Sequence, residues 1–162
     1  MRPVDDGNRE RLASLAVRQD QTHFVATVAK SYADAAADPA SHPRMWGIYA
    51  ADEPVGFMLL SDGAEPIEEE PGRWPYGLWR LLIDARHQGR GYGRAALDLL
   101  VDYVAGRPGA TELYTSAVPG EGSALPFYER YGFVRTGEID EGEVVLRLGL
   151  TAPMRRPNDR DP

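Results

Sequence analysis

The sequence contains no cysteine, and this absence excludes several kinds of site at once. A chain without thiols has no disulfide framework, no thiolate metal ligand and no cysteine nucleophile. Long apolar runs are absent too, because the longest ones, Gly56–Leu60 and Leu78–Ile83, are far too short to span a bilayer. The charged start of the chain, with Arg2, Asp5 and Asp6, lacks the apolar segment of a secretory signal. We therefore expect a cytoplasmic protein that does not enter a membrane.

Basic residues are in deficit, and lysine is represented by Lys30 alone. The 18 basic and 25 acidic side chains give a formal net charge of −7. This balance disfavours nucleic-acid binding, which depends on basic surface, and favours cationic ligands. The 162 residues, 43% of them hydrophobic, fit one folded domain over residues 1–150. The last segment, 151–162, holds three prolines and little to bury, which predicts a disordered tail.

Hydrophobic periodicity predicts a mixed α/β domain. Apolar residues at helical spacing, with capping and breaking residues at the ends, predict helices over residues 5–18, 24–37 and 92–105, and a short one that opens near Ser123. Alternating or continuous apolar runs predict strands over residues 45–51, 55–61, 76–84, 112–118, 133–139 and 143–148. The polar stretch over residues 62–75, with three prolines, reads as a loop.

The most informative segment is a glycine-rich turn between a predicted strand and a predicted helix, Leu81-Leu-Ile-Asp-Ala-Arg-His-Gln-Gly-Arg-Gly-Tyr-Gly-Arg94. Glycines at 89, 91 and 93 let the backbone adopt positive φ and approach a ligand closely. The free N–H groups at a helix start favour an anion such as a phosphate. Arg86, Arg90 and Arg94 add positive charge, with no acidic residue between 85 and 94.

Three phosphate-binding motifs compete for this turn. A P-loop needs GxxxxGK[ST], but the single lysine is distant. A dinucleotide fingerprint needs GxGxxG after a strand, whereas Gly89-Arg-Gly91-Tyr-Gly93 has the wrong spacing. The sequence Gln88-Gly-Arg-Gly91-Tyr-Gly93 does match Q/RxxGxG/A, the pyrophosphate turn of the GNAT acetyltransferases. Tight packing alone is the other explanation for such a turn.

A second motif follows about thirty residues later, Ala124-Leu-Pro-Phe-Tyr128-Glu-Arg-Tyr-Gly132-Phe133, which is similar to the GNAT signature AxxxYxxxGF. With both motifs in order, the chain resembles the GNAT N-acetyltransferase superfamily. More narrowly, it resembles the bacterial diamine/spermine/spermidine acetyltransferases of the Blt type. The resemblance implies a central, mostly antiparallel sheet with splayed fourth and fifth strands, flanked by about four helices.

The resemblance also implies acetyl-CoA as cosubstrate. The pantetheine arm would pair with the fourth strand at Leu81, Leu82 and Ile83. The pyrophosphate would rest on the turn, at Gln88, Gly89, Arg90, Gly91, Tyr92, Gly93 and Arg94. Tyr128 matches the family tyrosine that protonates the departing thiolate. A phenol of pKa about 10 and a thiol of pKa about 8.5 are close enough for that transfer. Without the motif, Tyr128 reads as an ordinary core aromatic.

Three positions depart from the family pattern. Glu121 stands where many members carry a cofactor-binding Asn. Ser116 and Gly77 stand where relatives carry a glutamate base, so the amine loses its proton through water or to a carboxylate elsewhere. Since an acyl-cysteine is excluded, direct attack of the amine on acetyl-CoA is the simpler mechanism.

Two acidic segments suggest where an amine binds. One includes Glu68, Glu69 and Glu70 with Asp62 and Glu65, and the other includes Glu143 with Glu138, Asp140 and Glu141. Paired carboxylates suit a substrate with several ammonium groups, and Trp79 offers an aromatic face for a cation. Solvated surface is the plainer explanation for such runs. The three histidines lack metal-ligand spacing, so no metal site is expected.

We therefore expect an N-acetyltransferase that acts on a primary amine of a small polycation, a polyamine or diamine. Acetylation of an aminoglycoside or a protein amine is an alternative, and so is a non-catalytic acyl-CoA-binding module. A homodimer is possible, although no interface is indicated by the sequence.

Overall fold

The computed structural model describes residues 1–63 and 74–150. Its centre is a seven-stranded sheet in the order β1-β2-β3-β4-β5-β7-β6. The strands are β1 (Arg2–Pro3), β2 (Pro43–Ala50), β3 (Glu53–Asp62), β4 (Tyr76–Ile83), β5 (Glu112–Ala117), β6 (Val134–Asp140) and β7 (Glu143–Gly149). All neighbouring strands are antiparallel except β4 and β5, which are parallel.

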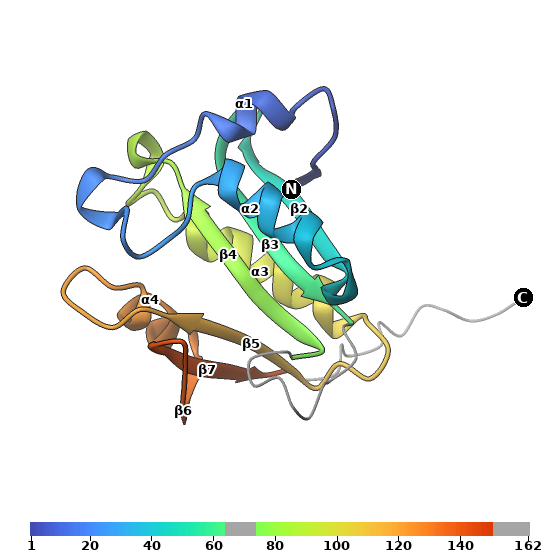
Figure 1. The fold of residues 1–162 in the computed structure, drawn as a ribbon, viewed down its shortest axis with the longest axis vertical. Helices are drawn as coiled ribbons and strands as arrows, with labels where there is room; N and C mark the ends of the chain where they lie inside the picture. The colour runs from blue at the N-terminus through green and yellow to red at the C-terminus, as the bar shows by residue number, and fades with distance from the viewer. Residues whose placement is uncertain (64–73, 151–162) are drawn as a thin grey trace, which may run out of the picture.

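Helices cover both faces of this sheet. In Figure 1, α2 (Val28–Ala37) lies in front of the sheet while α3 (Tyr92–Ala105) lies behind it. The short helix α1 (Arg9–Ala13) shares a core with α2, and α4 (Leu125–Tyr131) shares a core with α3. Single 3-10 turns are η1 (Gln19–Gln21), η2 (Pro39–Ser41) and η3 (Ala85–His87).

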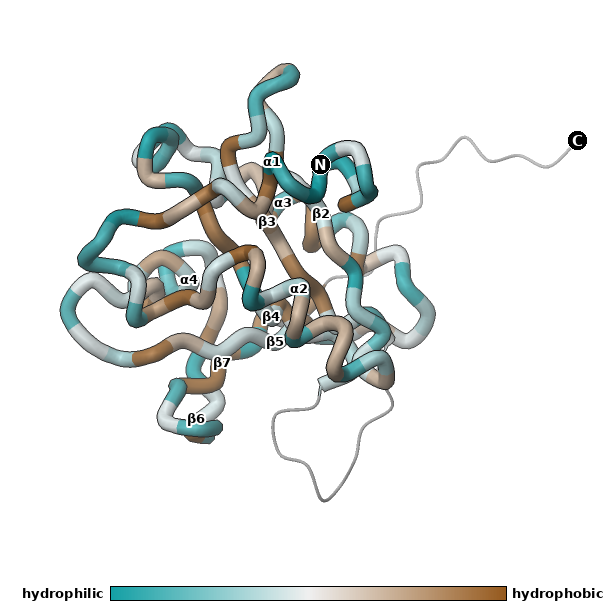
Figure 2. Tube along the Cα trace, turned by 45° about the horizontal axis from the view of Figure 1, so that its top comes forward, coloured by the Kyte–Doolittle hydropathy of each residue, from teal (hydrophilic) through white to brown (hydrophobic). Residues whose placement is uncertain are grey.

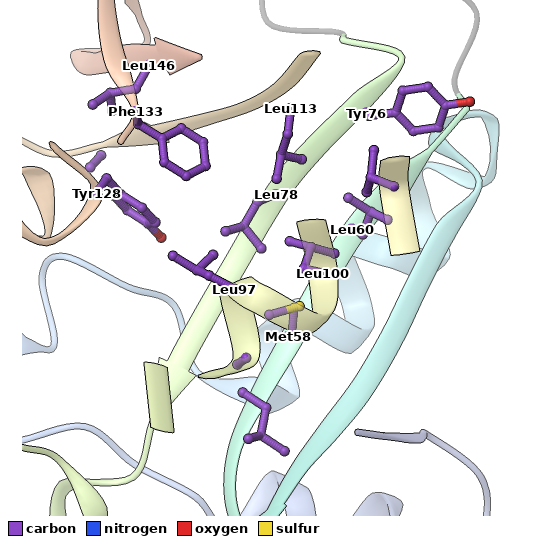
Figure 3. Packing of buried hydrophobic residues seen from close by; sticks show 14 of the residues in the cluster. Met58, Leu60, Tyr76, Leu78, Leu97, Leu100, Leu113, Tyr128, Phe133 and Leu146 are labelled. Carbon is purple, nitrogen blue, oxygen red and sulfur yellow. The ribbon is translucent and has the colours of Figure 1, made fainter. Parts of the chain in front are cut away.

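Strand β3 shows why a continuous apolar run suits the centre of this sheet. Phe57 and Leu59 point to the α1/α2 face, and Met58 and Leu60 point to the α3/α4 face. Successive side chains of a strand face opposite sides, so each covered face requires its own apolar set. Figure 2 shows the hydrophobic segments along the central strands, with hydrophilic residues in the peripheral loops. Figure 3 shows how the α3/α4 side of this core is filled.

The expected mixed sheet with separated fourth and fifth strands is confirmed. Strands β4 and β5 pair at only two positions, Gly77 with Tyr114 and Leu78 with Thr115. Beyond Leu78 the two strands diverge, as Figure 1 shows.

Two helix predictions are wrong in extent. The expected helix over residues 5–18 is reduced to Arg9–Ala13, because the Asp5 carboxylate accepts the N–H groups of Gly7 and Asn8 in a turn that replaces helix. The expected helix over residues 24–37 begins only at Val28. The hydroxyl of Thr27 accepts the N–H of Lys30 and caps the helix there, so residues 24–26 stay outside it.

The end of β4 is tied to the α1 side of the fold by the buried carboxylate of Asp84. It accepts the N–H of Ala16 at 3.1 Å, the N–H of Arg86 at 3.0 Å and the Arg86 Nε at 2.7 Å. Burial would raise the pKa of this carboxyl. The hydrogen bonds and charge of Arg86 and the Ala16 N–H outweigh burial, so the pKa lies below its usual value.

We expect Asp84→Asn to lower the free energy of unfolding by about 2 kcal/mol at neutral pH, because a buried charge-assisted network is lost. Since the folded-state pKa is depressed, this stabilisation is complete above the unfolded pKa of about 3.9 and is lost as the pH falls toward the folded value. Urea unfolding of wild type and Asp84→Asn, from neutral to acid pH, measures the difference in their free energies of unfolding.

Asp52→Asn is the control, because its side chain is 94% exposed and pairs only with Arg2 on the surface. It should change the free energy of unfolding by less than about 0.5 kcal/mol. A difference between Asp84→Asn and wild type that grows toward acid would contradict this account.

Candidate active site

A cavity of about 850 Å³ opens where β4 and β5 separate. Its walls come from the diverging ends of both strands, the start of α3, the α4 side and the segment over residues 22–26. Strand β7 adds Glu143. The cavity is large enough for an extended cofactor arm together with a small acceptor.

The turn before α3 presents backbone N–H groups to this cavity. Gly89 and Gly91 have φ of +74° and +83°, and a Cβ at either position would meet no atom within 4 Å. Helix α3 begins after Gly91 with no side-chain cap and no acidic residue in its first turn. The positive end of the helix dipole is therefore unneutralised, which fits an anionic group such as a phosphate.

The three arginines of this turn have different roles. Arg94 lines the cavity, with its guanidinium 5.4 Å from the centre of the Tyr131 ring. Arg90 is exposed and does not line the cavity. Arg86 is paired with Asp84 at 2.7 Å, so its charge is compensated within the protein. The local positive charge on the cavity side is thus smaller than the sequence suggested.

The unpaired edge of β4 forms one wall of the cavity. The register passes from Leu60 opposite Leu78 to Leu59 opposite Arg80, so Trp79 is an extra residue in a β-bulge. The Leu82 carbonyl points to Gly56 on β3, so the backbone groups of its neighbours turn toward the cavity. The Ile83 carbonyl accepts Gln88 Nε2 at 3.0 Å, and Gln88 is also held by Gln21. The backbone of Leu81 remains as a pairing edge for an extended ligand.

The side chain of Tyr128 reaches the cavity from α4. Pro126 stands in the first turn of this helix, and Gly132 with φ of +129° follows its end. Figure 3 shows the Tyr128 ring beside Phe133, with its hydroxyl pointing in the direction of β4. Burial raises the pKa of Tyr128 to about 12, hydrogen bonding with the Thr115 side chain opposes the shift, and the charge of Glu143 adds to it. The phenol is therefore protonated at any ordinary pH.

A carboxylate faces the same cavity from the neighbouring strand. Glu143 accepts the Ser116 hydroxyl at 2.5 Å and is the only carboxylate among the described residues that line the cavity. Trp79 and Arg80 also line the cavity. The Arg80 guanidinium donates to the Trp79 carbonyl and lies 3.5 Å from Asp34, while its buried Nε has no hydrogen-bond partner in the described part of the chain.

Comparison with known proteins is consistent with this geometry. Residues 9–133 match the model of the Acetyltransferase (GNAT) family. This chain belongs to the GNAT family. It is an N-acetyltransferase by family, and the family uses acetyl-CoA as acyl donor.

Three relatives are informative. The spermine/spermidine N(1)-acetyltransferase of Bacillus subtilis is 29% identical over 147 residues, 90% of this chain and 95% of that protein. An aminoglycoside N(6')-acetyltransferase type 1 of Klebsiella pneumoniae is 31% identical over 91 residues, 54% of this chain and 45% of that protein. A spermidine N-acetyltransferase from Vibrio cholerae, solved with CoA and spermine, shares the fold with a TM-score of 0.61 and 19% identity, covering 93% and 95% of the two chains.

Most residues that the sequence assigns to this GNAT site meet at the cavity. Those that line it are Leu81, Ile83, Gln88, Gly89, Gly91, Tyr92, Gly93, Arg94, Tyr128, Trp79 and Glu143. Leu82 does not, since its side chain packs in the α1/α2 core. Glu68, Glu69 and Glu70 lie outside the described residues.

The other acidic residues of the two predicted clusters that the structure describes do not line the cavity. Asp62 is buried elsewhere and accepts hydrogen bonds from Tyr103 at 2.7 Å and Arg107 at 3.0 Å, so it has a structural role. Glu138 and Glu141 are exposed outside the cavity, as is Glu121. Among the described residues no helix is long and apolar enough to cross a membrane, and no cluster that could hold a metal ion is present.

Phe24 and Arg80 also line the cavity, and neither was predicted to do so from the sequence. Phe24 fell within the predicted helix over residues 24–37, but it precedes the helix and lies near Gly120 and Gly122 of the loop before α4. The capping residue Thr27 was the available signal that Phe24 precedes the helix. Arg80 has no comparable signal, because the bulge at Trp79 determines where its side chain lies.

We expect Gly91→Ala to weaken acetyl-CoA binding by about tenfold or more, because its Cβ would enter the space where the turn presents its N–H groups. Backbone strain at positive φ should cost about 1 kcal/mol of folding stability as well. Isothermal titration with acetyl-CoA measures the binding effect.

Gly109→Ala separates the two effects, because Gly109 has φ of +70°, open space around its Cβ and no place in the cavity lining. It should lose similar stability and bind acetyl-CoA as wild type does. Equal binding by Gly91→Ala and Gly109→Ala would rule out this use of the turn.

Proposed function

We propose that this GNAT enzyme transfers the acetyl group of acetyl-CoA to a primary amine of a small polycation, a polyamine or diamine, by direct attack within a ternary complex. The observation that supports this best is that the carboxylate of Glu143 and the indole of Trp79 line the same cavity. A carboxylate and an aromatic face are the groups that bind an ammonium. The similarity to a Bacillus spermine/spermidine acetyltransferase over 90% of the chain supports the same substrate class.

In this proposal the turn from Gln88 to Arg94 holds the pyrophosphate and the edge of β4 pairs with the pantetheine arm. The N–H groups at the start of α3 supply hydrogen bonds to the anion, and Arg94 supplies charge. Gln88 contributes by bracing the turn against Ile83 and Gln21. Acetyl-CoA, when bound, supplies the acetyl group that is transferred.

Tyr128 is the proposed acid for the departing thiolate. Its pKa of about 12 is higher than the ordinary phenol pKa of about 10. Early transfer of its proton to a thiolate, whose thiol has a pKa of about 8.5, is therefore less favourable. The phenol therefore acts as a hydrogen-bond donor to sulfur first. The phenol proton moves to the sulfur as the acceptor nitrogen releases its own proton. The two proton transfers therefore depend on each other.

The acceptor half of the cavity limits the substrates that fit. Glu143 is the single carboxylate among the described lining residues, so the described wall favours one ammonium over two. Glu68, Glu69 and Glu70 stay the predicted contacts for the distal ammonium groups. An aminoglycoside also carries several ammonium groups, and the Klebsiella relative favours it as the second candidate.

The acceptor is tested by CoA release, read with a thiol reagent, across spermine, spermidine, putrescine, kanamycin and short peptides. The protein has no cysteine and adds no thiol background. We expect release with the polyamines at a kcat/KM at least tenfold above that for kanamycin or peptides. Preference for kanamycin would replace the substrate assignment, and acetyl-CoA binding without release for any acceptor would favour a non-catalytic module.

We expect Tyr128→Phe to lower kcat by about 100-fold while acetyl-CoA affinity stays within about twofold, because general acid catalysis typically contributes 10²–10⁴. Steady-state CoA release and a binding titration measure the two quantities. Tyr131→Phe is a matched control, since its hydroxyl bonds Asp98 outside the cavity. Unchanged turnover of Tyr128→Phe removes this residue from the mechanism.

A further inference from the structure

The ammonium group of a polyamine must lose a proton before its nitrogen can attack, and the usual family positions for a base hold no carboxylate here. Ser116 on β5 and Gly77 on β4 occupy those positions. Gly77 lies at the joined end of the two strands, outside the cavity lining. Ser116 does line the cavity, and its hydroxyl is bound to the carboxylate of Glu143.

The sheet register explains how a residue of β7 reaches the Ser116 position. Ser116 pairs with Val145 in the antiparallel β5–β7 ladder, and Glu143 is two residues from Val145 on the same face. Diagonal neighbours of this kind are within reach of a long side chain. The carboxylate of Glu143 therefore lies against the β5 position where relatives have their own glutamate.

We infer that Glu143 is the proton acceptor for the incoming amine and that Ser116 is its positioning residue. This rests on the proposed function. Ser116 holds one carboxylate oxygen at 2.5 Å, and the described residues provide no second partner for Glu143. The other oxygen is therefore available to an ammonium in the cavity.

The acid and the base approach from opposite faces of β5. Thr115 points to the α3/α4 face, where it meets Tyr128, and Ser116 points to the other face, where it meets Glu143. The cavity is lined by both Tyr128 and Glu143, and the two are near enough for the charge of Glu143 to act on Tyr128, so a substrate that fills the gap between β4 and β5 can reach both groups. An amine on one face can thus attack a thioester whose sulfur leaves toward the other.

The proton balance is complete with these two groups. Glu143 takes a proton from the ammonium, and the freed lone pair forms the C–N bond as the C–S bond breaks. Tyr128 gives its proton to the sulfur, which leaves with the bonding electron pair, and recovers a proton from the acetylated nitrogen. Glu143 then releases its proton to water. The products are the amide, free CoA and one proton.

Other titratable and charged groups on the cavity wall are the alternatives to Glu143. They are His23 before α2, Arg80 on β4, His87, Tyr92 and Arg94 at the turn, and Tyr128 and Arg130 on α4. The arginines do not accept protons in this range. His87 packs edge-on to Tyr92 at the cofactor turn, which leaves His23 as the rival base.

The test compares Glu143→Gln with wild type over neutral to alkaline pH, using the best acceptor of the polyamine panel with saturating acetyl-CoA. Glutamine keeps a carbonyl for the Ser116 hydroxyl but cannot take the proton. We expect kcat to fall about 100-fold at neutral pH. The variant's rate should then rise about tenfold per pH unit, because higher pH supplies the uncharged amine.

Glu141→Gln is the matched control, since Glu141 is exposed in the β6–β7 turn outside the cavity. It should follow the wild-type profile. Ser116→Ala should lower kcat severalfold with the KM for acetyl-CoA unchanged, and Ser116→Thr should restore it. Acetyl-CoA titration and thermal unfolding near wild-type values show that Glu143→Gln is folded.

Three results would overturn the inference. A raised acceptor KM with unchanged kcat and pH profile makes Glu143 a binding residue only. A steep pH dependence in His23→Gln, with a flat one in Glu143→Gln, moves the base to His23. Ser116→Ala with wild-type kcat removes its positioning role. Failure of the proposed function looks different, because wild type itself then releases no CoA with any polyamine.

Discussion

The short parallel contact between β4 and β5 is the constraint on which the site depends. Each strand has a full antiparallel partner on its other side, β3 for β4 and β7 for β5, so neither needs the other beyond two pairs. The bulge at Trp79 alters the path of β4 just past the last pair. The result is an internal sheet edge that exposes backbone groups without weakening either half of the sheet.

An exposed strand edge within a fold must satisfy its polar groups. Here side chains take part of that role, because Gln88 binds the Ile83 carbonyl and Arg80 binds the Trp79 carbonyl. The backbone of Leu81 lies between them and faces the cavity. The protein thus protects most of the edge and leaves a short stretch for an extended ligand, which suits the pantetheine pairing that we propose.

The same divergence gives the two proposed proton-transfer groups independent environments. Tyr128 is buried in the α3/α4 core, where desolvation keeps the phenol protonated. Glu143 lies at a half-exposed position on the opposite face of β5, where its carboxylate accepts the Ser116 hydroxyl. Because alternate residues of a strand face opposite sides, adjacent Thr115 and Ser116 support groups with opposite tasks.

The sequence alone predicted the glycine turn and the mixed sheet, which depend on local spacing and backbone freedom, and its two motifs carried the resemblance to the family. It overextended the first two helices, because the Asp5 side chain accepts backbone N–H groups in a turn and the Thr27 hydroxyl caps the second helix so that it begins only at Val28. The spacing of apolar residues does not reveal such capping, and for this reason Phe24 was predicted to lie within the helix.

Contacts between distant segments were decided by the tertiary structure alone. The hydrogen bond from the Ala16 N–H to Asp84, the burial that raises the pKa of Tyr128 and the reach of Glu143 to Ser116 each depend on strand register or packing. Ser116 and Glu143 are 27 residues apart in the chain, and a shift of one residue in the β5–β7 ladder would place them on opposite faces. The sequence determined which groups are present, and the register determined which of them meet.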